Sequence, residues 1–213
     1  MIFSDQYVQS SPEIREMMYT RVAQALNYPD QDLVAGLLDY SFIQNLLAIV
    51  EEIERPGTKE AVQDLQQEYG NTTKSPEDLL LALEKDYTWM CFASKPRQVY
   101  LFESVYREGK LLQESTFEIA RLYYEAGLQM DEGFDMPPDH IATEFEFLAY
   151  LCFREIEGIN EDDEEKKMYA QTLQHQVLEE HLGPFASRFA RALEHNAGTS
   201  FYKAMGRFIQ AIV

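Results

Sequence analysis

The chain has 213 residues, of which 46% are hydrophobic, and a formal net charge of −19. A chain of this length can bury roughly 70% of its unfolded surface, so it needs no disulfide or metal to hold a core. Its acidity argues against binding to the phosphate backbone of nucleic acids, which needs a basic surface. The charge is uneven: residues 183–213 hold four basic residues and one acidic residue, a net of +3, and everything before them carries −22.

This acidity leaves two interpretations open. A strong negative field attracts cationic partners and speeds their encounter with the protein, or the charge only keeps the protein soluble. The first residues have no signal-peptide pattern and no apolar run is long enough to span a bilayer, so we expect a cytoplasmic protein. Cys91 and Cys152 match no metal or disulfide spacing, and we expect both to be buried thiols.

Helical periodicity runs through almost the whole chain, and no stretch alternates as a strand would. Ser11-Pro12-Glu13 and Ser75-Pro76-Glu77 have the order of cap, proline and acid that begins a helix. Asn160 is expected to cap a later helix, and Gly183-Pro184 to separate two helices. The predicted helices, in chain order, cover residues 12–26, 42–53, 58–69, 79–92, 115–126, 139–157, 165–182, 184–195 and 200–212.

These patterns predict an all-α fold, a single domain of about ten helices. We expect a helical part over residues 1–127, a hinge-like loop over 128–138 and a second helical part over 139–213. The loop sequence GLQMDEGFDMPP, residues 127–138, is a candidate hinge for domain swapping, so both a monomer and a swapped homodimer stay open.

The sequence lacks the motifs of several enzyme and cofactor classes. It has no glycine-rich phosphate loop, no H-E-x-x-H, no G-x-S-x-G, and no His-Asp dipeptide of the kind that helical phosphohydrolases often use. His175 and Glu179 are four residues apart, as are His140 and Glu144, but two ligands do not make a metal site. We expect the first of these pairs to be a surface pair, and we expect no metal, no cofactor and no catalytic residue.

The stretch MPPDHIATEFEFLAYL, residues 136–151, places two prolines directly before a helical pattern. The prolines exclude helix before Asp139, which suits a cap position. His140 and Glu144 then lie one turn apart beside the apolar face. Two interpretations stay open: a capped helix with a half-buried histidine, or a helix start that presents Asp139, His140 and free N–H groups to a ligand.

Three segments of the chain resemble the TorD/DmsD/NarJ chaperones, which assist assembly of molybdenum oxidoreductases. The first is PPDHIATEFEFLAYL, which is similar to that family's Pro-Asp-His-Ile segment and the helix after it. The second pairs YTWMCFA, Tyr87 to Ala93, with ESVYREGKLL, Glu103 to Leu112. The third is a weaker match at His181-Leu182 and the aromatic residues after it. Together the resemblance covers roughly residues 79–213.

The resemblance implies an all-helical, cytoplasmic protein that is no enzyme. Its partner would be the N-terminal, twin-arginine type signal peptide, or the apo form, of a molybdopterin-dependent oxidoreductase, held until the cofactor is inserted. An acidic protein with an aromatic groove suits a peptide with a cationic head and an apolar stretch. Nucleic acid and stable membrane insertion are not expected. The residues implied for peptide binding are Asp139, His140 and Glu144 at the polar end, with Tyr87, Met90, Ser104 and Tyr106 along the wall.

Two alternatives remain beside this interpretation. One is an assembly subunit of the nitrate-reductase type, which binds the enzyme's N-terminus without a role in twin-arginine export. The other is a small helical hydrolase that uses Asp139 and His140 as an acid–base pair, for which no nucleophile or metal set is visible.

Overall fold

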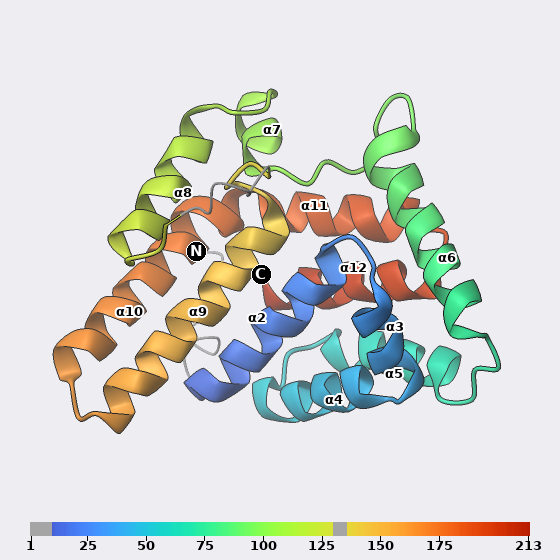
Figure 1. Ribbon diagram of the computed structural model, residues 1–213, viewed down its shortest axis with the longest axis horizontal. Coiled ribbons are helices and arrows are strands. Elements are labelled where there is room, and N and C mark those ends of the chain that lie inside the picture. Colours follow the sequence, from blue (N-terminus) through green and yellow to red (C-terminus); the bar gives the residue numbers. More distant parts are fainter. Residues whose placement is uncertain (1–9, 130–135) are drawn as a thin grey trace. The chain divides into compact units, whose positions relative to one another are not determined.

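A computed structural model describes residues 10–129 and 136–213, and every regular element within them is a helix (Figure 1). The only β feature in these two ranges is an isolated bridge between Phe102 and His140. The predicted all-α class is therefore confirmed. The chain groups into two compact units, which are described one at a time.

The first unit contains Met1–Thr20 and Leu101–Phe185. Its long helices α9 and α10 lie side by side and antiparallel (Figure 1), and Gly158 lets them meet closely, since a Cβ there would lie 2.7 Å from the backbone nitrogen of Lys167. The unit also holds the start of α2, which spans Pro12–Leu26. Its other elements are α7 (Glu103–Glu108), α8 (Glu114–Glu125), α9 (Ile141–Asn160), α10 (Glu164–Gln176) and the π-helical turn η2 (Val177–Leu182).

A buried ion pair ties the first turn of α2 to α9 and α10 within this unit. Arg15 donates to Glu155 Oε2 at 2.9 Å and to Gln174 Oε1 at 2.6 Å, and both partners are buried. Removing one member of a buried pair leaves an uncompensated charge and typically costs about 3–5 kcal/mol. The pair therefore holds these three helices in one arrangement.

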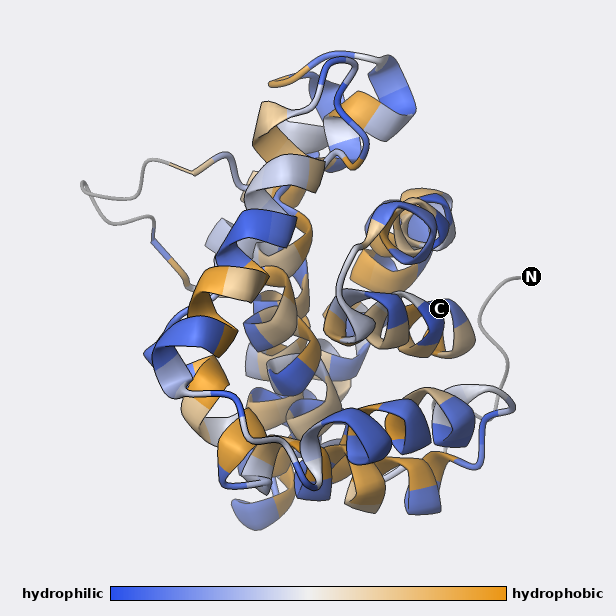
Figure 2. Cartoon of the chain, turned by 90° about the vertical axis from the view of Figure 1, so that its right-hand side faces the viewer, coloured by the Kyte–Doolittle hydropathy of each residue, from blue (hydrophilic) through white to orange (hydrophobic). Residues whose placement is uncertain are grey.

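The second unit contains Arg21–Tyr100 and Ala186–Val213. Its helices carry apolar residues along one side and hydrophilic residues along the other (Figure 2), the pattern expected of helices that share a core. Helix α12 packs on α5 and buries Phe201, Met205 and Phe208. The elements are α3 (Gln31–Leu38), α4 (Ser41–Ile53), α5 (Thr58–Tyr69), α6 (Pro76–Thr88), the π-helical turn η1 (Trp89–Ala93), most of α11 (Gly183–Asn196) and α12 (Ser200–Ile212).

The predicted helix starts at Ser11 and Ser75 are confirmed. Ser75 Oγ accepts a hydrogen bond from the Asp78 N–H at 3.1 Å, and Ser11 Oγ accepts one from Ile14 at 3.4 Å. Helices α3 and α7 were not predicted, because eight and six residues are too few for a clear 3.6-residue period.

Three boundary predictions were wrong. Gly183 has φ −54° and ψ −45°, so η2 continues into α11 and Gly183-Pro184 does not separate two helices. Asn160 ends α9, whereas Asp163 caps α10 by accepting from the Lys166 N–H at 3.0 Å. The helix expected to reach Phe92 stops as an α-helix at Thr88, and the chain then winds into the π-helical turn η1.

Both cysteines are free and buried, as predicted. Among the described residues no single helix has the length and apolar composition to cross a bilayer. Helices α3 and α4, which are bent by 72° where they meet, have that length and composition only when they are taken as one pair. The expected hinge falls largely on residues 130–135, which lie outside the described ranges. The division into 1–127, 128–138 and 139–213 therefore stays a prediction.

Candidate functional site

Asp139 lies at the start of α7 rather than at the start of the helix that follows it in sequence. Its Oδ2 accepts a hydrogen bond from the Ser104 N–H at 2.9 Å, and its carbonyl accepts one from the Glu103 N–H at 3.0 Å. Asp139 is fully buried. The carboxylate therefore satisfies backbone donors that the first turn of α7 leaves free, and the proposed cap of α9 is corrected to a cap of α7.

His140 is the residue that caps α9. Its Nδ1 accepts a hydrogen bond from the Ala142 N–H at 3.2 Å, which requires the imidazole to be neutral. Burial lowers the pKa of His140 to about 4, and the nearby charge of Asp139 only partly opposes this effect. Asp139 Oδ2 accepts from α7 and His140 Nδ1 accepts from α9, so these two atoms are not paired with each other as the hydrolase alternative would require.

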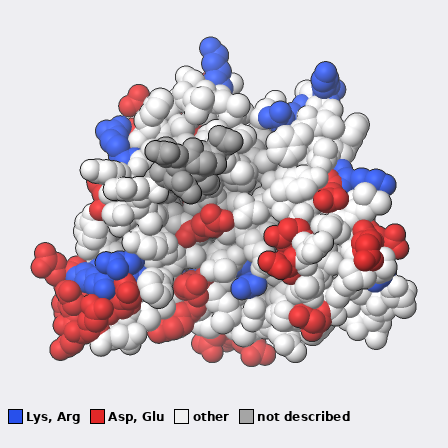
Figure 3. Space-filling model, in the orientation of Figure 1, with Lys and Arg blue, Asp and Glu red and all other residues white. Residues whose placement is uncertain are grey.

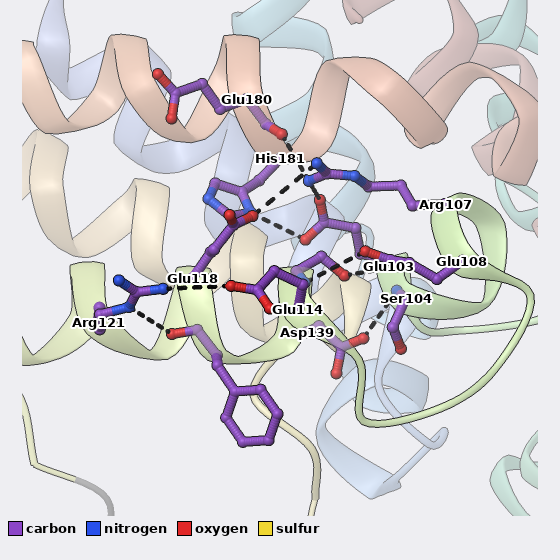
Figure 4. A network of polar contacts seen from close by, with 12 residues as sticks. Glu103, Ser104, Arg107, Glu108, Glu114, Glu118, Arg121, Asp139, Glu180 and His181 are labelled. Atoms are coloured by element: carbon purple, nitrogen blue, oxygen red, sulfur yellow. Dashed lines mark hydrogen bonds and ion pairs between the residues drawn. The ribbon is translucent and has the colours of Figure 1, made fainter.

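Glu103, in the first turn of α7, joins Arg107 and His181 to the same cluster (Figure 4). Its carboxylate accepts from Arg107 at 2.5 Å, and its other oxygen lies 2.9 Å from His181 Nδ1. Arg107 also donates to the carbonyl oxygen of Glu180 at 3.0 Å. These contacts join α7 to η2, so the cap by Asp139 is one part of a larger polar network.

Glu144 brings a third carboxyl into this buried region from the first turns of α9. It is fully buried, and neither of its oxygens accepts a hydrogen bond from any described residue. Burial raises the pKa of Glu144 well above its ordinary value, and the charges of Glu103 and Asp139 raise it further. Asp139 Oδ1 likewise has no hydrogen-bond donor among the described residues. We call Glu103, Ser104, Asp139, His140 and Glu144 the buried polar cluster.

Tyr123 closes this cluster from α8. Its hydroxyl donates to the carbonyl oxygen of Pro138 at 2.8 Å, and its ring meets Phe147 edge-on at 4.6 Å. Burial raises the pKa of Tyr123, as do the charges of Glu144 and Asp139. The segment just before Asp139 is thus held by a hydrogen bond that no sequence pattern predicts.

Tyr87 and Met90 belong to the second unit, where both are buried. The Tyr87 hydroxyl donates to the carbonyl oxygen of Leu26 at 2.8 Å, and the Met90 carbonyl accepts from Val99 at 3.1 Å. Tyr106, in the first unit, is half-buried and its ring lies 5.5 Å from that of Phe185. Apart from Tyr106, every residue predicted to bind peptide therefore offers no open surface in this conformation.

Three aromatic residues of the second unit are exposed around Tyr87, and we call them the aromatic surface: Tyr28, Trp89 and Phe92. They are 51%, 59% and 50% exposed. The Tyr87 ring lies 5.6 Å from Tyr28 and 6.0 Å from Phe92, and the Tyr28 hydroxyl lies 3.3 Å from that of Thr88, next to Trp89. The π-helical turn η1 buries Met90 and leaves Trp89 and Phe92 outside. A regular helical period does not predict that arrangement.

Acidic side chains are prominent on the face shown in Figure 3. A dense group lies at the lower left, where Figure 1 places the connection between α9 and α10 and where residues 161–165 are all exposed acids. His175 and Glu179 form the surface pair that was predicted, 3.2 Å apart and both exposed. Among the described residues no group of three or more His, Cys, Asp or Glu side chains has the geometry to hold a metal ion.

The family model described as nitrate reductase delta subunit matches residues 52–191, which is more than half of the chain. The chain belongs to the nitrate reductase delta subunit family. The match includes Tyr87, Met90, Ser104, Tyr106, Asp139, His140 and Glu144, so all the predicted site residues lie inside the family region.

Several relatives in this family are named as chaperones. The chain is 32% identical over 104 residues to the chaperone protein TorD of Photobacterium profundum, covering 47% of this chain and 48% of that protein. It is 30% identical over 96 residues to the selenate reductase assembly chaperone protein of Thauera selenatis, covering 44% and 49%. A longer match, 25% identical, covers 80% of this chain and 74% of the TorD of Salmonella arizonae. The first two matches span about half the length of those relatives.

A crystal structure from Archaeoglobus fulgidus has the same fold. That protein is described as a candidate redox enzyme maturation protein, and it aligns with a TM-score of 0.56 over 92% of this chain and 91% of its own. At 20% identity this likeness supports the fold alone. The resemblance to the TorD/DmsD/NarJ chaperones is confirmed, and the relatives named here are chaperones rather than enzymes.

Proposed function

We propose that this chain is a maturation chaperone for a molybdopterin-dependent oxidoreductase. It acts in the cytoplasm, binds the twin-arginine type N-terminal segment of the apo-enzyme, and holds it until the cofactor is inserted and export can begin. The named relatives support the chaperone role, and the aromatic surface is the observation that carries the peptide-binding part.

The aromatic surface suits the apolar stretch of such a segment. Exposed aromatic side chains that lie together on a folded protein usually mark an interaction site, because leaving them in water is unfavourable. Here Tyr28 and Phe92 are held by ring contacts with the buried Tyr87. The side chains are therefore already ordered before the partner arrives, which lowers the entropy cost of binding.

Charge supports the same partner. The net charge of −19 gives the protein a strong negative field, and two consecutive arginines on a peptide would be attracted to it. The residues that follow Phe92 do not share this acidity, since Lys95 and Arg97 lie close to it in the sequence and Arg97 lies 5.9 Å from the Phe92 ring. The cationic head is thus expected to bind elsewhere than on the aromatic surface.

The buried polar cluster can contact a peptide only after the structure around it opens. Asp139 Oδ1 and both Glu144 oxygens have no hydrogen-bond partner among the described residues, and two carboxyl groups left in this way could accept a guanidinium once Glu144 ionises. In the described conformation they are fully buried. Direct contact with a peptide therefore requires α7 to leave its cap at Asp139.

The test is calorimetric binding of a synthetic peptide that carries two consecutive arginines followed by an apolar stretch. Phe92→Ala is expected to weaken binding roughly tenfold or more, since burying a phenylalanine contributes about 1.5–3 kcal/mol. Phe153→Ala is the matched control, because Phe153 on α9 is also 50% exposed but belongs to the other unit. Equal effects of the two substitutions would remove the aromatic surface from the proposal, and no binding by the wild type would end it.

A second candidate follows from the description of the family model itself. A nitrate-reductase-type assembly subunit would bind the enzyme's N-terminus without a role in twin-arginine export. Co-purification separates the two, because such a subunit would stay with the mature, cofactor-loaded enzyme. A chaperone of the proposed kind would be recovered with the apo-enzyme and lost from the mature one.

A further inference from the structure

A groove runs between α3 and α6 in the second unit, and we call it the α3–α6 groove. Its apolar lining is formed by Val34, Ala35, Leu38, Pro76 and Leu80. Gln31 and Glu77 add the polar part of its wall, and its volume is about 280 Å³. None of these residues is part of the predicted peptide site or of the aromatic surface.

The two segments that border this groove are strongly acidic. Residues 27–40 and 75–84 together contain six acidic residues and no lysine or arginine. Asp32, Asp39 and Glu77 are exposed. Hydrogen bonds from Ser41 hold the pKa of Asp39 below its ordinary value, so this carboxylate is ionised at neutral pH. With Glu77 in its wall and Asp32 next to Gln31 in the sequence, this apolar groove suits a ligand that carries apolar and cationic groups side by side.

The size of the groove favours peptide side chains over a small molecule. Pockets for small ligands usually have about 300–1,000 Å³, so this groove is at or below the lower limit. One or two aliphatic side chains would fill it, while flanking cationic side chains would reach Asp32 and Glu77. A peptide offers both from one chain.

The aromatic surface begins in the first of these segments, with Tyr28, and continues past the end of the second, with Trp89 and Phe92. Tyr28 lies three residues before Gln31, and Trp89 lies nine residues after Leu80. At 1.5 Å per residue these nine positions span about 13 Å along the helix axis, a distance that four or five extended residues can cover. One peptide segment is therefore long enough to reach both.

We propose that the α3–α6 groove binds the junction between the cationic head and the apolar stretch of the client's N-terminal segment. This inference rests on the proposed function and adds to it a first place where the arginines bind, while the buried polar cluster is still closed. The apolar side chains next to the head enter between Leu38 and Leu80, and the arginines pair with Asp32 and Glu77. The remaining apolar stretch then reaches the aromatic surface.

The experiment compares two peptides and three proteins by calorimetry. One peptide carries two consecutive arginines followed by an apolar stretch, and its twin carries glutamines in place of the arginines. The proteins are the wild type, Asp32→Asn with Glu77→Gln, and a control with Glu51→Gln and Glu60→Gln. The control removes the same two charges from exposed positions of α4 and α5 in the same unit. Thermal unfolding of each protein checks that the substitutions leave the fold intact.

The groove variant is expected to bind the arginine peptide about tenfold more weakly and the glutamine peptide as the wild type does. The control is expected to change either affinity less than twofold. In a separate measurement with the same two peptides, a further variant, Ala35→Phe, which fills the groove at an exposed position of α3, is expected to weaken binding of both peptides. Equal losses in the groove variant and the control would overturn the inference and leave the proposed function standing. A wild type that binds neither peptide would end both.

Discussion

Asp139 Oδ2 accepts a hydrogen bond from the Ser104 N–H at 2.9 Å across thirty-five positions of sequence. The same aspartate immediately precedes His140, the cap of α9, so one short turn begins two helices. The bridge between Phe102 and His140 brings these two starts together. The Pro-Asp-His segment is therefore a junction in the interior of the first unit.

The substitutions Asp139→Asn and Asp139→Ala distinguish the capping hydrogen bond of Asp139 from its negative charge. Asparagine keeps an oxygen that can accept from the Ser104 N–H, so the melting temperature is expected to stay near that of the wild type. Alanine leaves that buried donor unpaired and is expected to cost about 1–3 kcal/mol in the free energy of unfolding. Chemical denaturation measures both. A silent Asp139→Ala would contradict the capping role.

The same asparagine variant tests the role proposed for the cluster in binding. If Asp139 meets a cationic peptide head after α7 opens, Asp139→Asn is expected to weaken peptide binding about tenfold to a hundredfold at unchanged stability. Unchanged affinity would leave Asp139 as a structural cap only.

Glu144→Gln is expected to stabilise the protein increasingly as pH rises. Because the pKa of Glu144 is raised in the folded state, the folded protein holds a proton that the unfolded chain releases above about pH 4.5. The wild type therefore loses stability above that pH, by up to about 1.4 kcal/mol per pH unit until the folded-state pKa is reached. Glu103, Asp139 and Tyr123 face this carboxyl, with Arg107 as the opposing cation.

The measurement is the difference in unfolding free energy between Glu144→Gln and the wild type at pH 5 and at pH 8. Glu146→Gln, on the exposed side of the same helix, is the control. A difference for Glu144→Gln that is the same at both pH values would show that this carboxyl is ionised in the folded protein.

His140→Asn is expected to make the free energy of unfolding fall less steeply as the pH is lowered. The folded-state pKa of His140, about 4, lies below its ordinary value of 6.5, so protonation favours the unfolded chain. The contribution of neutral His140 is complete above pH 6.5 and falls, by up to about 1.4 kcal/mol per unit, as pH drops from 6.5 to 4. Asparagine can still cap α9 but does not titrate. The measurement is the unfolding free energy of His140→Asn and of the wild type between pH 7 and pH 4.5. A difference between the two proteins that stays constant over this range would contradict the prediction.

Association of the arginine peptide is expected to slow markedly as salt rises. Exposed charges are screened beyond about 8 Å at physiological ionic strength, so the field of a protein with −19 net charge reaches less far. Stopped-flow association rates at low and high salt measure this, with the glutamine peptide as the control. A salt-independent rate for the arginine peptide would leave only apolar docking.

Local sequence signals are sufficient to predict several of the helices. Helices α4, α5 and α12 follow from apolar residues at helical spacing, and α6 begins where Ser75 and Pro76 predict. Each of these signals depends on residues within one or two turns, so no distant contact is needed to recognise it. The family segments around Tyr87, Ser104 and Asp139 were also visible in the sequence.

The hydrogen-bond partners and the burial of the residues in those segments depend on tertiary contacts. A hydrogen bond from Ser104 to Asp139 joins residues far apart in the chain, so no local pattern distinguishes a cap of α7 from a cap of α9. Burial likewise depends on what packs above a residue. Tyr87 and Met90 were expected at a surface and are covered, while Trp89 and Phe92 are exposed. The π-helical turn η1, which contains Trp89, Met90 and Phe92, changes the angle between successive side chains.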